Sequence, residues 1–565
     1  MIRPASLLRH SAAPSVLCFL LLAICATLAA LPALRGDWIY DDFKMLNNPA
    51  LDDAGDVFSA FMRDSSDYLG QRTSGEGQAV TYRPLSNATL VLPFLLSKSP
   101  RLSSHLITFF LYLCIGGLLL WMDQRRWHRL TLSGALLTAL ILLHPTFGEA
   151  WLWVSGRQDA LAGAFLMASA ALLTPGLDST DSTPQRLSAV RFSALVLTAL
   201  AALLSKESVL PVLLAVFLAS ALPYRWTGSV DMSVCFRAAF VRVGPVLLAV
   251  LLYVLLRSIA VGDHTGMPSL ITVFKRWPLI SAIGLETVLS PVPRPMRMLA
   301  FEYHLGWTGA RIAAGIALAS LVVFLGATGR VRTLVLLAGG LGSLLLCGFT
   351  VDYFWQGFDR YLLFPGLMGV LSLLWGVKAA PISTWRWGYS IPILIALILF
   401  VSLHLQARVY RSQRTFVEAS LSMDADSGIG QMWVARQYLF TGEKGRALSV
   451  LREVEHLSLP APMPRNAAAI ALDAGDPAVG EHFLERAYWA APDFPGTRRD
   501  LLIVRAWRGR WDEVESLARG LLAEPDACET TRLELQRVLK LFPAPAEKNE
   551  ILNELTAEDI CRYVR

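Results

Sequence analysis

The sequence predicts an all-α protein in which a polytopic membrane domain of about eleven helices precedes a C-terminal domain of helical repeats. Its 565 residues are 54% hydrophobic and only 17% charged, whereas soluble proteins carry about 25% charged residues. The charge deficit is confined to a long apolar part of the chain, and the sequence from Ala407 onward has the composition of a soluble helical domain. We therefore predict a membrane domain over residues 1–406 and a separate domain over residues 407–565.

Each predicted membrane span is a run of about 20 apolar residues, the length that crosses a bilayer as a helix. The runs cover residues 15–34, 102–122, 130–148, 159–175, 188–204, 207–222, 240–261, 311–328, 332–350, 361–378 and 387–406. The first run resembles a signal peptide, but it lacks a convincing cleavage site and is predicted to be an uncleaved helix. Two weaker segments, residues 85–96 and 270–289, are short or interrupted by proline and charge, which favours re-entrant or interfacial pieces.

The cations predict the orientation of these spans. Arg3 and Arg9 belong to one set of loops, which also holds arginine clusters such as Arg125 and Arg126, while the opposite short loops hold about one cation each. Cytoplasmic loops are enriched in lysine and arginine, so the N-terminus is predicted to be cytoplasmic. With eleven spans, the C-terminal domain lies in the periplasm or a lumen, and the composition is compatible with a bacterial inner membrane. The net charge of +6 is modest and does not indicate nucleic-acid binding.

The C-terminal domain shows an internal period. Gly442, Gly475 and Gly509 recur at intervals of 33 and 34 residues, and a small residue follows each glycine five positions later. This is the period of the tetratricopeptide helix-turn-helix, and it predicts about three units. Such a solenoid offers a concave surface to a peptide or protein partner and carries no evident chemistry of its own.

Polar residues gather at the predicted outer ends of the spans, where charged groups near membrane depth are costly and usually functional. The first outer loop, residues 35–101, begins with three acids, Asp37, Asp41 and Asp42. Adjacent carboxylates can serve as a base, as metal ligands or as a helix cap, or they can form a solvated acidic loop. The other polar residues at outer ends are Arg83, His144, Glu149, Arg157, Asp159, Lys206, Glu207, Asp352, Asp359 and Arg360.

Acids and cations at one membrane surface suit transfer of a sugar from a lipid phosphate. An aspartate near the first helix can take the proton of an attacking hydroxyl. Positive charge stabilises the leaving phosphate, and Arg83, Arg157, Lys206 and Arg360 could supply it. Snorkelling or a neighbouring acid explains any one cation taken alone, so the prediction depends on the set. No Cys-x-x-Cys or Cys/His cluster indicates a zinc site.

The order of motifs resembles a known family. The strings "YDD" with "NNP", "YRPL", "HP" with "EA" and "GRQDALA", "SKE" and "DRYLLFP" are followed by the repeats. Nearly the whole chain is similar to the transmembrane and tetratricopeptide-repeat-containing O-mannosyltransferases and their bacterial relatives, in the GT-C glycosyltransferase superfamily. The resemblance implies inverting transfer from a polyprenyl-phosphate sugar to a hydroxyl acceptor.

The resemblance also implies roles for individual residues. Asp41 corresponds to the base and Asp42 to a supporting acid. The positions that match the remaining motifs, and therefore the donor and its phosphate, are Arg83, His144, Glu149, Arg157, Asp159, Lys206, Glu207 and Arg360. The chain departs from the family at Phe147, where relatives often have histidine, and at Asp359, where they have glutamate. Some members of the superfamily use a divalent metal, but no clear ligand set predicts one here.

Two other classes of function compete with an enzyme. A membrane scaffold would use the repeats to recruit envelope partners, and it would tolerate asparagine at Asp41 and Asp42. A transporter or flippase predicts ionisable residues at mid-span, whereas those of this chain lie at predicted span ends. The sequence leaves open which sugar is transferred and whether the acceptor is protein, glycan or lipid. It also leaves open whether Cys528 and Cys561 form a disulfide in an oxidising compartment.

Overall fold

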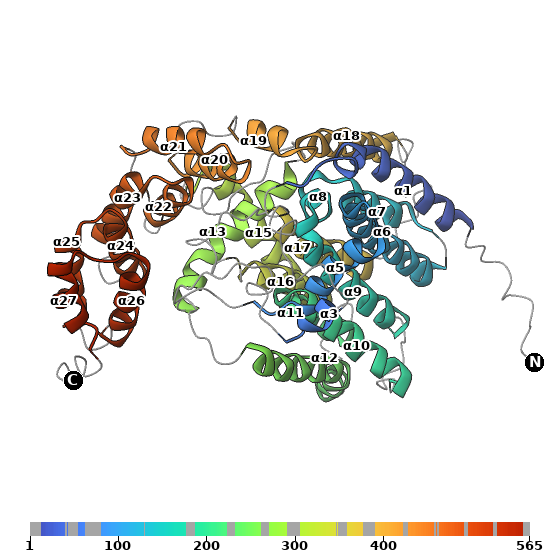
Figure 1. The fold of residues 1–565 in the computed structure, drawn as a ribbon. Helices are drawn as coiled ribbons and strands as arrows, with labels where there is room; N and C mark the ends of the chain where they lie inside the picture. Colours follow the sequence, from blue (N-terminus) through green and yellow to red (C-terminus); the bar gives the residue numbers. More distant parts are fainter. Residues whose placement is uncertain are drawn as a thin grey trace, which may run out of the picture. The chain divides into compact units, whose positions relative to one another are not determined.

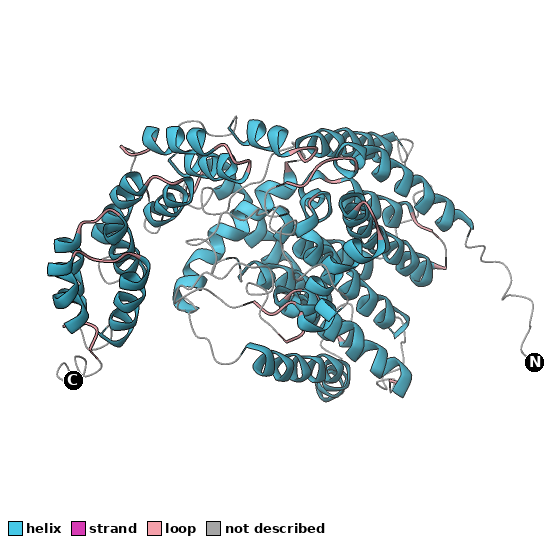
Figure 2. Cartoon of the chain, viewed as in Figure 1, coloured by secondary structure: helices cyan, strands magenta, loops and turns pink. Residues whose placement is uncertain are grey.

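The computed structural model describes most of the chain outside the longer loops. The described residues are 13–39, 42, 55–62, 81–128, 130–176, 187–222, 232–261, 270–290, 306–345, 347, 359–376, 390–421, 428–456, 459, 463–490, 495–523 and 528–557. Every regular element within these ranges is a helix, and none of the described residues forms a strand (Figure 2). The predicted all-α class is therefore confirmed for this part of the chain.

The chain separates into two compact units, with the division between Ala419 and Ser420. The first unit contains the apolar helices, and the second contains the shorter, more polar helices that follow. The predicted boundary between residues 406 and 407 separates a membrane domain from a water-exposed domain. The division into two compact units does not test which residues lie in a membrane. The boundary stays a prediction.

Four helices of the first unit are long and apolar enough to cross a membrane, among the residues that the structure describes. They are α1 (Ala13–Leu34), α6 (Pro100–Trp127), α12 (Met232–Val261) and α15 (Gly309–Ala327). Two bent pairs pass the same test when each pair is taken together: α7 (Leu132–Leu143) with α8 (Pro145–Leu152), and α18 (Ser390–Val409) with α19 (Gln413–Leu421). These four to six apolar helices indicate a membrane protein, while the predicted count of eleven spans is not established.

Several predicted spans are represented by shorter helices. These are α9 (Arg157–Leu173), α10 (Ala189–Ser205), α11 (Leu210–Ala221), α16 (Val331–Leu345) and α17 (Leu363–Gly376). The two weaker segments form α5 (Pro84–Leu96) and α13 (Leu270–Leu289), the latter with Pro278 inside the helix. Whether α5 and α13 are re-entrant or interfacial stays a prediction.

The predicted span over residues 130–148 is broken at His144. Helix α7 ends before this residue, and α8 continues at an angle of 57°. Pro145 lacks a backbone N–H and disfavours helical geometry in the residue before it. The His144 imidazole Nδ1 accepts a hydrogen bond from the Thr146 backbone N–H at 3.2 Å and so caps the new helix. The break turns α8 into a short segment that leads directly to the "GRQD" string.

The helices of the first unit pack through small residues. Helix α1 lies beside α18 and α6, α9 lies between α6 and α10, and α16 packs on both α11 and α17 (Figure 1). A Cβ at Gly366 of α17 would lie 2.4 Å from Cζ of Phe147. The Phe147 ring on α8 therefore packs directly against the α17 backbone. This contact gives an apolar structural role to the position where the resembling family often has histidine.

The second unit consists of consecutive helix pairs. The pairs are α20 (Gly428–Phe440) with α21 (Lys444–Glu453), α22 (Met463–Ala474) with α23 (Pro477–Ala490), α24 (Pro495–Trp507) with α25 (Trp511–Leu522), and α26 (Cys528–Leu541) with α27 (Ala546–Glu554). Gly442, Gly475 and Gly509 lie in the turns within the first three pairs at φ of 78°, 93° and 72°. Only glycine adopts this left-handed geometry without strain. The tetratricopeptide identity of the pairs stays a prediction.

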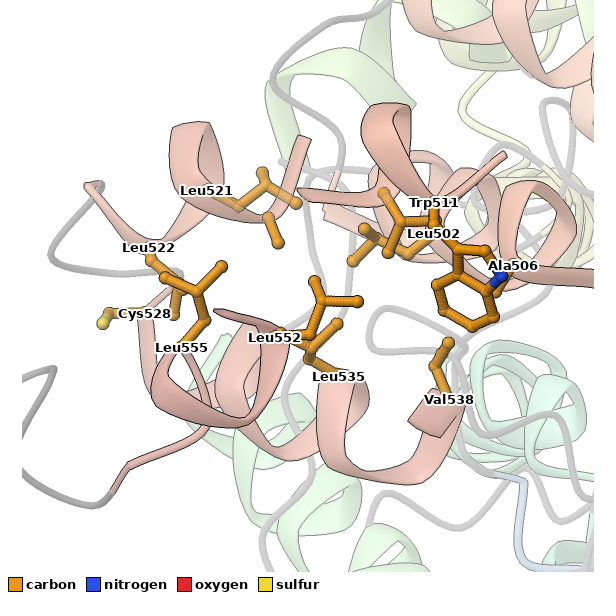
Figure 3. Close-up of a cluster of buried hydrophobic side chains, with 12 residues drawn as sticks. Leu502, Ala506, Trp511, Leu521, Leu522, Cys528, Leu535, Val538, Leu552 and Leu555 are labelled. Carbon is orange, nitrogen blue, oxygen red and sulfur yellow. The ribbon is translucent and has the colours of Figure 1, made fainter. Parts of the chain in front are cut away.

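A cluster of buried hydrophobic side chains joins the last two helix pairs of the second unit. Trp511 and Leu521 of α25 pack with Leu535 of α26 and Leu552 of α27 (Figure 3). Cys528, at the start of α26, belongs to the same cluster and is disulfide-bonded. Cys561, whose pairing with Cys528 the sequence leaves open, lies outside the described residues.

Candidate active site

Three 3-10 turns and the N-terminus of one helix bring most of the predicted polar residues together in the first unit. The turns are η4 (Val154–Gly156) between α8 and α9, η6 (Glu207–Val209) between α10 and α11, and η8 (Asp359–Leu362) before α17. Turn η4 contacts α6, α8 and α9, turn η6 contacts α9, and turn η8 contacts α8 and α16. The N-terminus of α5, preceded by Arg83, joins them because α5 packs on α9 and α10.

Asp42 is held in a fixed position on turn η4. Its side chain is completely buried. Oδ1 of Asp42 accepts hydrogen bonds from the Ser155 backbone N–H at 3.0 Å and from the Ser155 hydroxyl at 2.8 Å. These bonds join residues 113 positions apart and tie the first outer loop to the "GRQD" corner. Asp41, the predicted base, lies outside the described residues, as does Asp352.

Arg83 and Glu207 form a two-point ion pair. Nε and Nη2 of Arg83 donate to the two carboxylate oxygens of Glu207 at 2.8 and 2.6 Å. Nη1 of the same guanidinium donates to Oε1 of Gln158 at 2.7 Å. The two-point pairing with Glu207 fixes the plane of the Arg83 guanidinium, and bidentate pairs of this kind are among the stronger side-chain interactions. It links the start of α5 to turn η6 and to the first turn of α9.

Lys206 and Asp159 form a second pair that is wholly buried. The ammonium of Lys206 donates to Oδ1 of Asp159, and the two side chains are 1% and 0% exposed. Nζ of Lys206 also lies 4.1 Å from the centroid of the Tyr361 ring, which adds a cation–π attraction. A buried charge of this kind persists only when it is paired.

Arg360 completes the cationic part of the site. Its guanidinium carbon lies 4.7 Å from the ring centroid of Trp153 and 5.2 Å from that of Tyr361. Trp153 directly precedes turn η4, two residues before the serine that holds Asp42. A carboxylate and a guanidinium are therefore held by the same short stretch of chain.

Two buried carboxylate oxygens remain available in this cluster. None of the described residues donates a hydrogen bond to Oε1 of Glu149 or to Oδ2 of Asp159. Both side chains are at least 99% buried, and buried polar atoms are normally hydrogen-bonded. Hydroxyl groups of a bound substrate would satisfy both oxygens.

Arg157 and His144 occupy structural positions at the edge of the cluster. The Arg157 guanidinium is completely buried and donates to the Thr108 hydroxyl at 2.9 Å, the Thr89 carbonyl at 2.5 Å and the Ser104 carbonyl at 2.9 Å. These bonds tie α9 to α5 and α6. His144 caps α8, as described above. The predicted contact of either residue with a donor stays a prediction.

Four residues of the site had no predicted role: Gln158 and Tyr361 lie within the quoted strings, and Trp153 and Ser155 lie between "EA" and "GRQDALA". Ser155 holds Asp42, Gln158 holds Arg83, and the rings of Trp153 and Tyr361 face Lys206 and Arg360. Their nearness to the charged positions in sequence was the available signal. Their partners are distant in sequence, so the local strings could not assign these contacts.

Two acids of the cluster, Asp159 and Glu207, are paired with cations. Among the described residues, no group of three or more histidine, cysteine, aspartate and glutamate side chains could hold a metal ion. Asp41 is not among those residues, so the part of the first outer loop that contains it is not covered by this statement.

Comparison with known proteins supports a distant relationship to mannosyltransferases. No protein-family model matches the chain. A stretch of 142 residues, 25% of this chain, is 25% identical to a curated protein O-mannosyl-transferase of Caenorhabditis elegans. The match spans 20% of the length of that relative. The chain is therefore distantly similar to an O-mannosyltransferase, which suggests glycosyl transfer.

Proposed function

We propose that the protein is a membrane glycosyltransferase of the GT-C type that moves a sugar from a polyprenyl-phosphate carrier to a hydroxyl acceptor. The main support for the proposal is that one short stretch of chain contacts both an acid and a cation. Ser155 donates a hydrogen bond to Asp42, and the Trp153 ring faces the Arg360 guanidinium. Asp42 is therefore bound by the same stretch of chain that contacts the Arg360 guanidinium. Transfer to a hydroxyl from a phosphate leaving group needs both.

In the proposed reaction, the acceptor oxygen attacks the anomeric carbon of the donor sugar while the bond from that carbon to the phosphate oxygen breaks. Asp41 takes the acceptor proton as general base, and Asp42 supports it as the neighbouring acid. Lys206 and Arg360 stabilise the negative charge that develops on the lipid phosphate. Because attack and departure occur on opposite faces, the anomeric configuration inverts.

The remaining residues bind and orient the donor. Glu149 and Asp159 accept hydrogen bonds from sugar hydroxyls through their available oxygens. The Arg83–Glu207 ion pair holds the start of α5 and turn η6 in one geometry, and preorganisation of this kind lowers the barrier to reaction. Arg157 and His144 keep the surrounding helices in place. The reaction as proposed needs no cofactor, although a divalent metal bound through the first outer loop would be compatible with it.

We further propose a bacterial inner-membrane location, with the N-terminus in the cytoplasm and the second domain in the periplasm. The disulfide at Cys528 supports an oxidising compartment for that domain. The second domain would recruit a protein or peptide acceptor. Mannose and a protein hydroxyl are the candidate sugar and acceptor, because the relative is named a protein O-mannosyl-transferase.

A donor comparison tests the proposal. Purified protein in membranes receives radiolabelled mannose either on polyprenyl phosphate or on a nucleotide, together with an envelope protein extract. We expect label in the extract only with the lipid-linked donor. Transfer from the nucleotide sugar alone would contradict the lipid-linked mechanism. Equal label in membranes without the protein would favour a scaffold that recruits envelope partners.

A further inference from the structure

Each of the three 3-10 turns at the candidate active site leads directly into a short helix. Turn η4 is followed by α9, turn η6 by α11 and turn η8 by α17. These helices have 17, 12 and 14 residues, so at a rise of about 1.5 Å per residue they extend about 18 to 26 Å from the turns. Their C-terminal ends therefore lie well away from the candidate active site.

Arginines of neighbouring helices bind the C-terminal ends of α9 and α11. Helix α10 packs on α9, and α16 packs on α11 (Figure 1). Arg191, in the first turn of α10, donates to the Leu172 carbonyl of α9 through Nε, at 2.8 Å, and through Nη2. Arg332, in the first turn of α16, donates through the same two nitrogens, at 3.2 and 2.7 Å, to the carbonyl of Leu222, which directly follows α11. Each guanidinium thus holds one helix end with two hydrogen bonds.

The C-terminal end of α17 is bound by a third arginine. Nη1 of Arg126, in the last turn of α6, donates to the Leu374 carbonyl in the last turn of α17. The last four carbonyls of a helix have no partner within the helix, and a cation at this end offsets the negative end of the helix dipole. Hydrogen bonds from a charged donor are also stronger than neutral ones, so each arginine fixes the position of a helix end.

These arginines were predicted only to orient the spans. Arg126, Arg191 and Arg332 belong to the cation-rich chain segments that are predicted to be cytoplasmic. Orientation depends on the number of cations in a loop and not on their bonding partners. In the structure, however, each of the three bonds to a different helix that begins at the candidate active site. This correspondence indicates a second role for the three arginines.

We propose that Arg126, Arg191 and Arg332 are positioning residues for the candidate active site. Each fixes the axial position of one helix, and the helix transmits that position to the turn at its other end. The turns must keep their places relative to one another, because Lys206, just before η6, pairs with Asp159, just after η4. A displacement of about 1 Å caused by a distant change can cost about 100-fold in rate.

This inference rests on the proposed function, because it assigns the turns to the reaction. One part of its test needs no substrate, so the two proposals fail separately. The main variant is Arg332→Leu, which removes the hydrogen bonds to the Leu222 carbonyl. Arg330→Leu is the matched control, since it removes a cation two residues away, whose guanidinium lies 5.8 Å from the centroid of the Phe324 ring.

Thermal unfolding of the full-length protein in detergent micelles provides the measurement without substrate. Arg332→Leu is combined with Glu207→Gln, which breaks the ion pair with Arg83 at the other end of α11. Changes more than about 10 Å apart usually have additive effects. If α11 transmits its position, Arg332→Leu already weakens the Arg83–Glu207 pair, so the melting shift of the double variant should be smaller than the sum of the single shifts. Arg330→Leu and Glu207→Gln should have additive effects.

Transfer rates, measured well below the onset of unfolding, provide the second measurement. We expect kcat of Arg332→Leu to fall about 10- to 100-fold. The KM for the lipid-linked donor should change less than about twofold, because a misplaced turn affects the transition state more than the bound donor. Arg332→Lys keeps a cationic donor and should give a kcat between those of wild type and Arg332→Leu. Arg330→Leu should retain the wild-type kcat.

Two results would overturn the proposal. The first is additive melting shifts for Arg332→Leu and Glu207→Gln, which would limit Arg332 to capping α11. The second is a kcat that falls equally in Arg332→Leu and Arg330→Leu, or in neither, while wild type transfers sugar. Arg332→Gln takes the place of Arg332→Leu if the leucine variant does not fold. If wild type transfers no sugar but the melting shifts are not additive, the proposed function fails and the coupling along α11 stands.

Discussion

The buried Lys206–Asp159 pair leads to a prediction that separates structural from catalytic importance. The change is Lys206→Met, which keeps the length of the side chain and removes its charge. Asp159 then stays buried without its cation, because the two side chains are 1% and 0% exposed in the pair. Removing one partner of a buried ion pair costs about 3–5 kcal/mol of folding stability. Loss of the cation–π contact with Tyr361 adds about 1–2 kcal/mol.

The double variant Lys206→Met/Asp159→Leu removes both charges at once. Replacing a whole buried pair with apolar side chains is often neutral or stabilising, so most of the lost stability should return. The assay is thermal unfolding in detergent, followed through the intrinsic fluorescence of the 16 tryptophans. Lys444→Met, on the exposed surface of the second unit, is the matched control and should not change the melting temperature.

Melting temperatures and transfer rates together distinguish a role of the pair in folding stability from a role in the reaction. A Lys206→Met protein that melts at the wild-type temperature would refute the buried pair. If the double variant is as stable as wild type and still fails to transfer sugar, the pair serves the reaction. Wild-type transfer by the stable double variant would show that the pair only supports the fold.

Further predictions concern single contacts. Ser155→Ala removes one hydrogen bond to Asp42 and leaves the backbone bond. A bond to a charged group contributes about 1.5–3 kcal/mol, so transfer should fall by about 10- to 150-fold. An unchanged rate would argue against positioning through the hydroxyl. Glu481 of α23 is buried and accepts hydrogen bonds from Arg508 and Arg510, so Glu481→Gln should lower stability by about 2 kcal/mol at pH 7. The pKa of Glu481 is lowered in the folded state. The full difference in stability between wild type and variant is therefore present above the unfolded pKa of about 4.3, and it should vanish as the pH falls through the folded pKa. A difference in melting temperature that stays constant from pH 7 to pH 3 would contradict this prediction. Cys528→Ser should lower stability by about 2–4 kcal/mol, and addition of dithiothreitol to the wild type should reproduce the shift; no shift with either would argue against a stabilising disulfide.

Local sequence signals predicted much of the helical framework. The glycine period placed Gly442, Gly475 and Gly509 at turns, and these residues have the positive φ that favours glycine. The break at His144 was missed because the apolar run continues through it, although the following proline was a sufficient signal. Hydropathy averages over a run, whereas a single proline and a capping side chain decide where a helix ends.

The candidate site was predictable in its residues but not in its pairings. Asp42 and Ser155 are 113 residues apart, and Arg83 and Glu207 are 124 residues apart. No local pattern states which acid meets which cation, since that depends on how helices pack in three dimensions. The chemistry of "SKE" suggested two charged site residues, while the packing assigned Lys206 to Asp159 and Glu207 to Arg83.

The proposed sugar transfer depends on Asp41 and Asp42, the acidic pair of the first outer loop. The most direct test compares transfer from a labelled polyprenyl-phosphate sugar by Asp41→Asn, Asp42→Asn and Asp37→Asn at equal expression. Asp37 lies in the same loop, is exposed and pairs with Arg101, so it is the matched control. We expect Asp41→Asn and Asp42→Asn to lose transfer and Asp37→Asn to retain it. Equal transfer by all three variants would contradict the account and favour the scaffold.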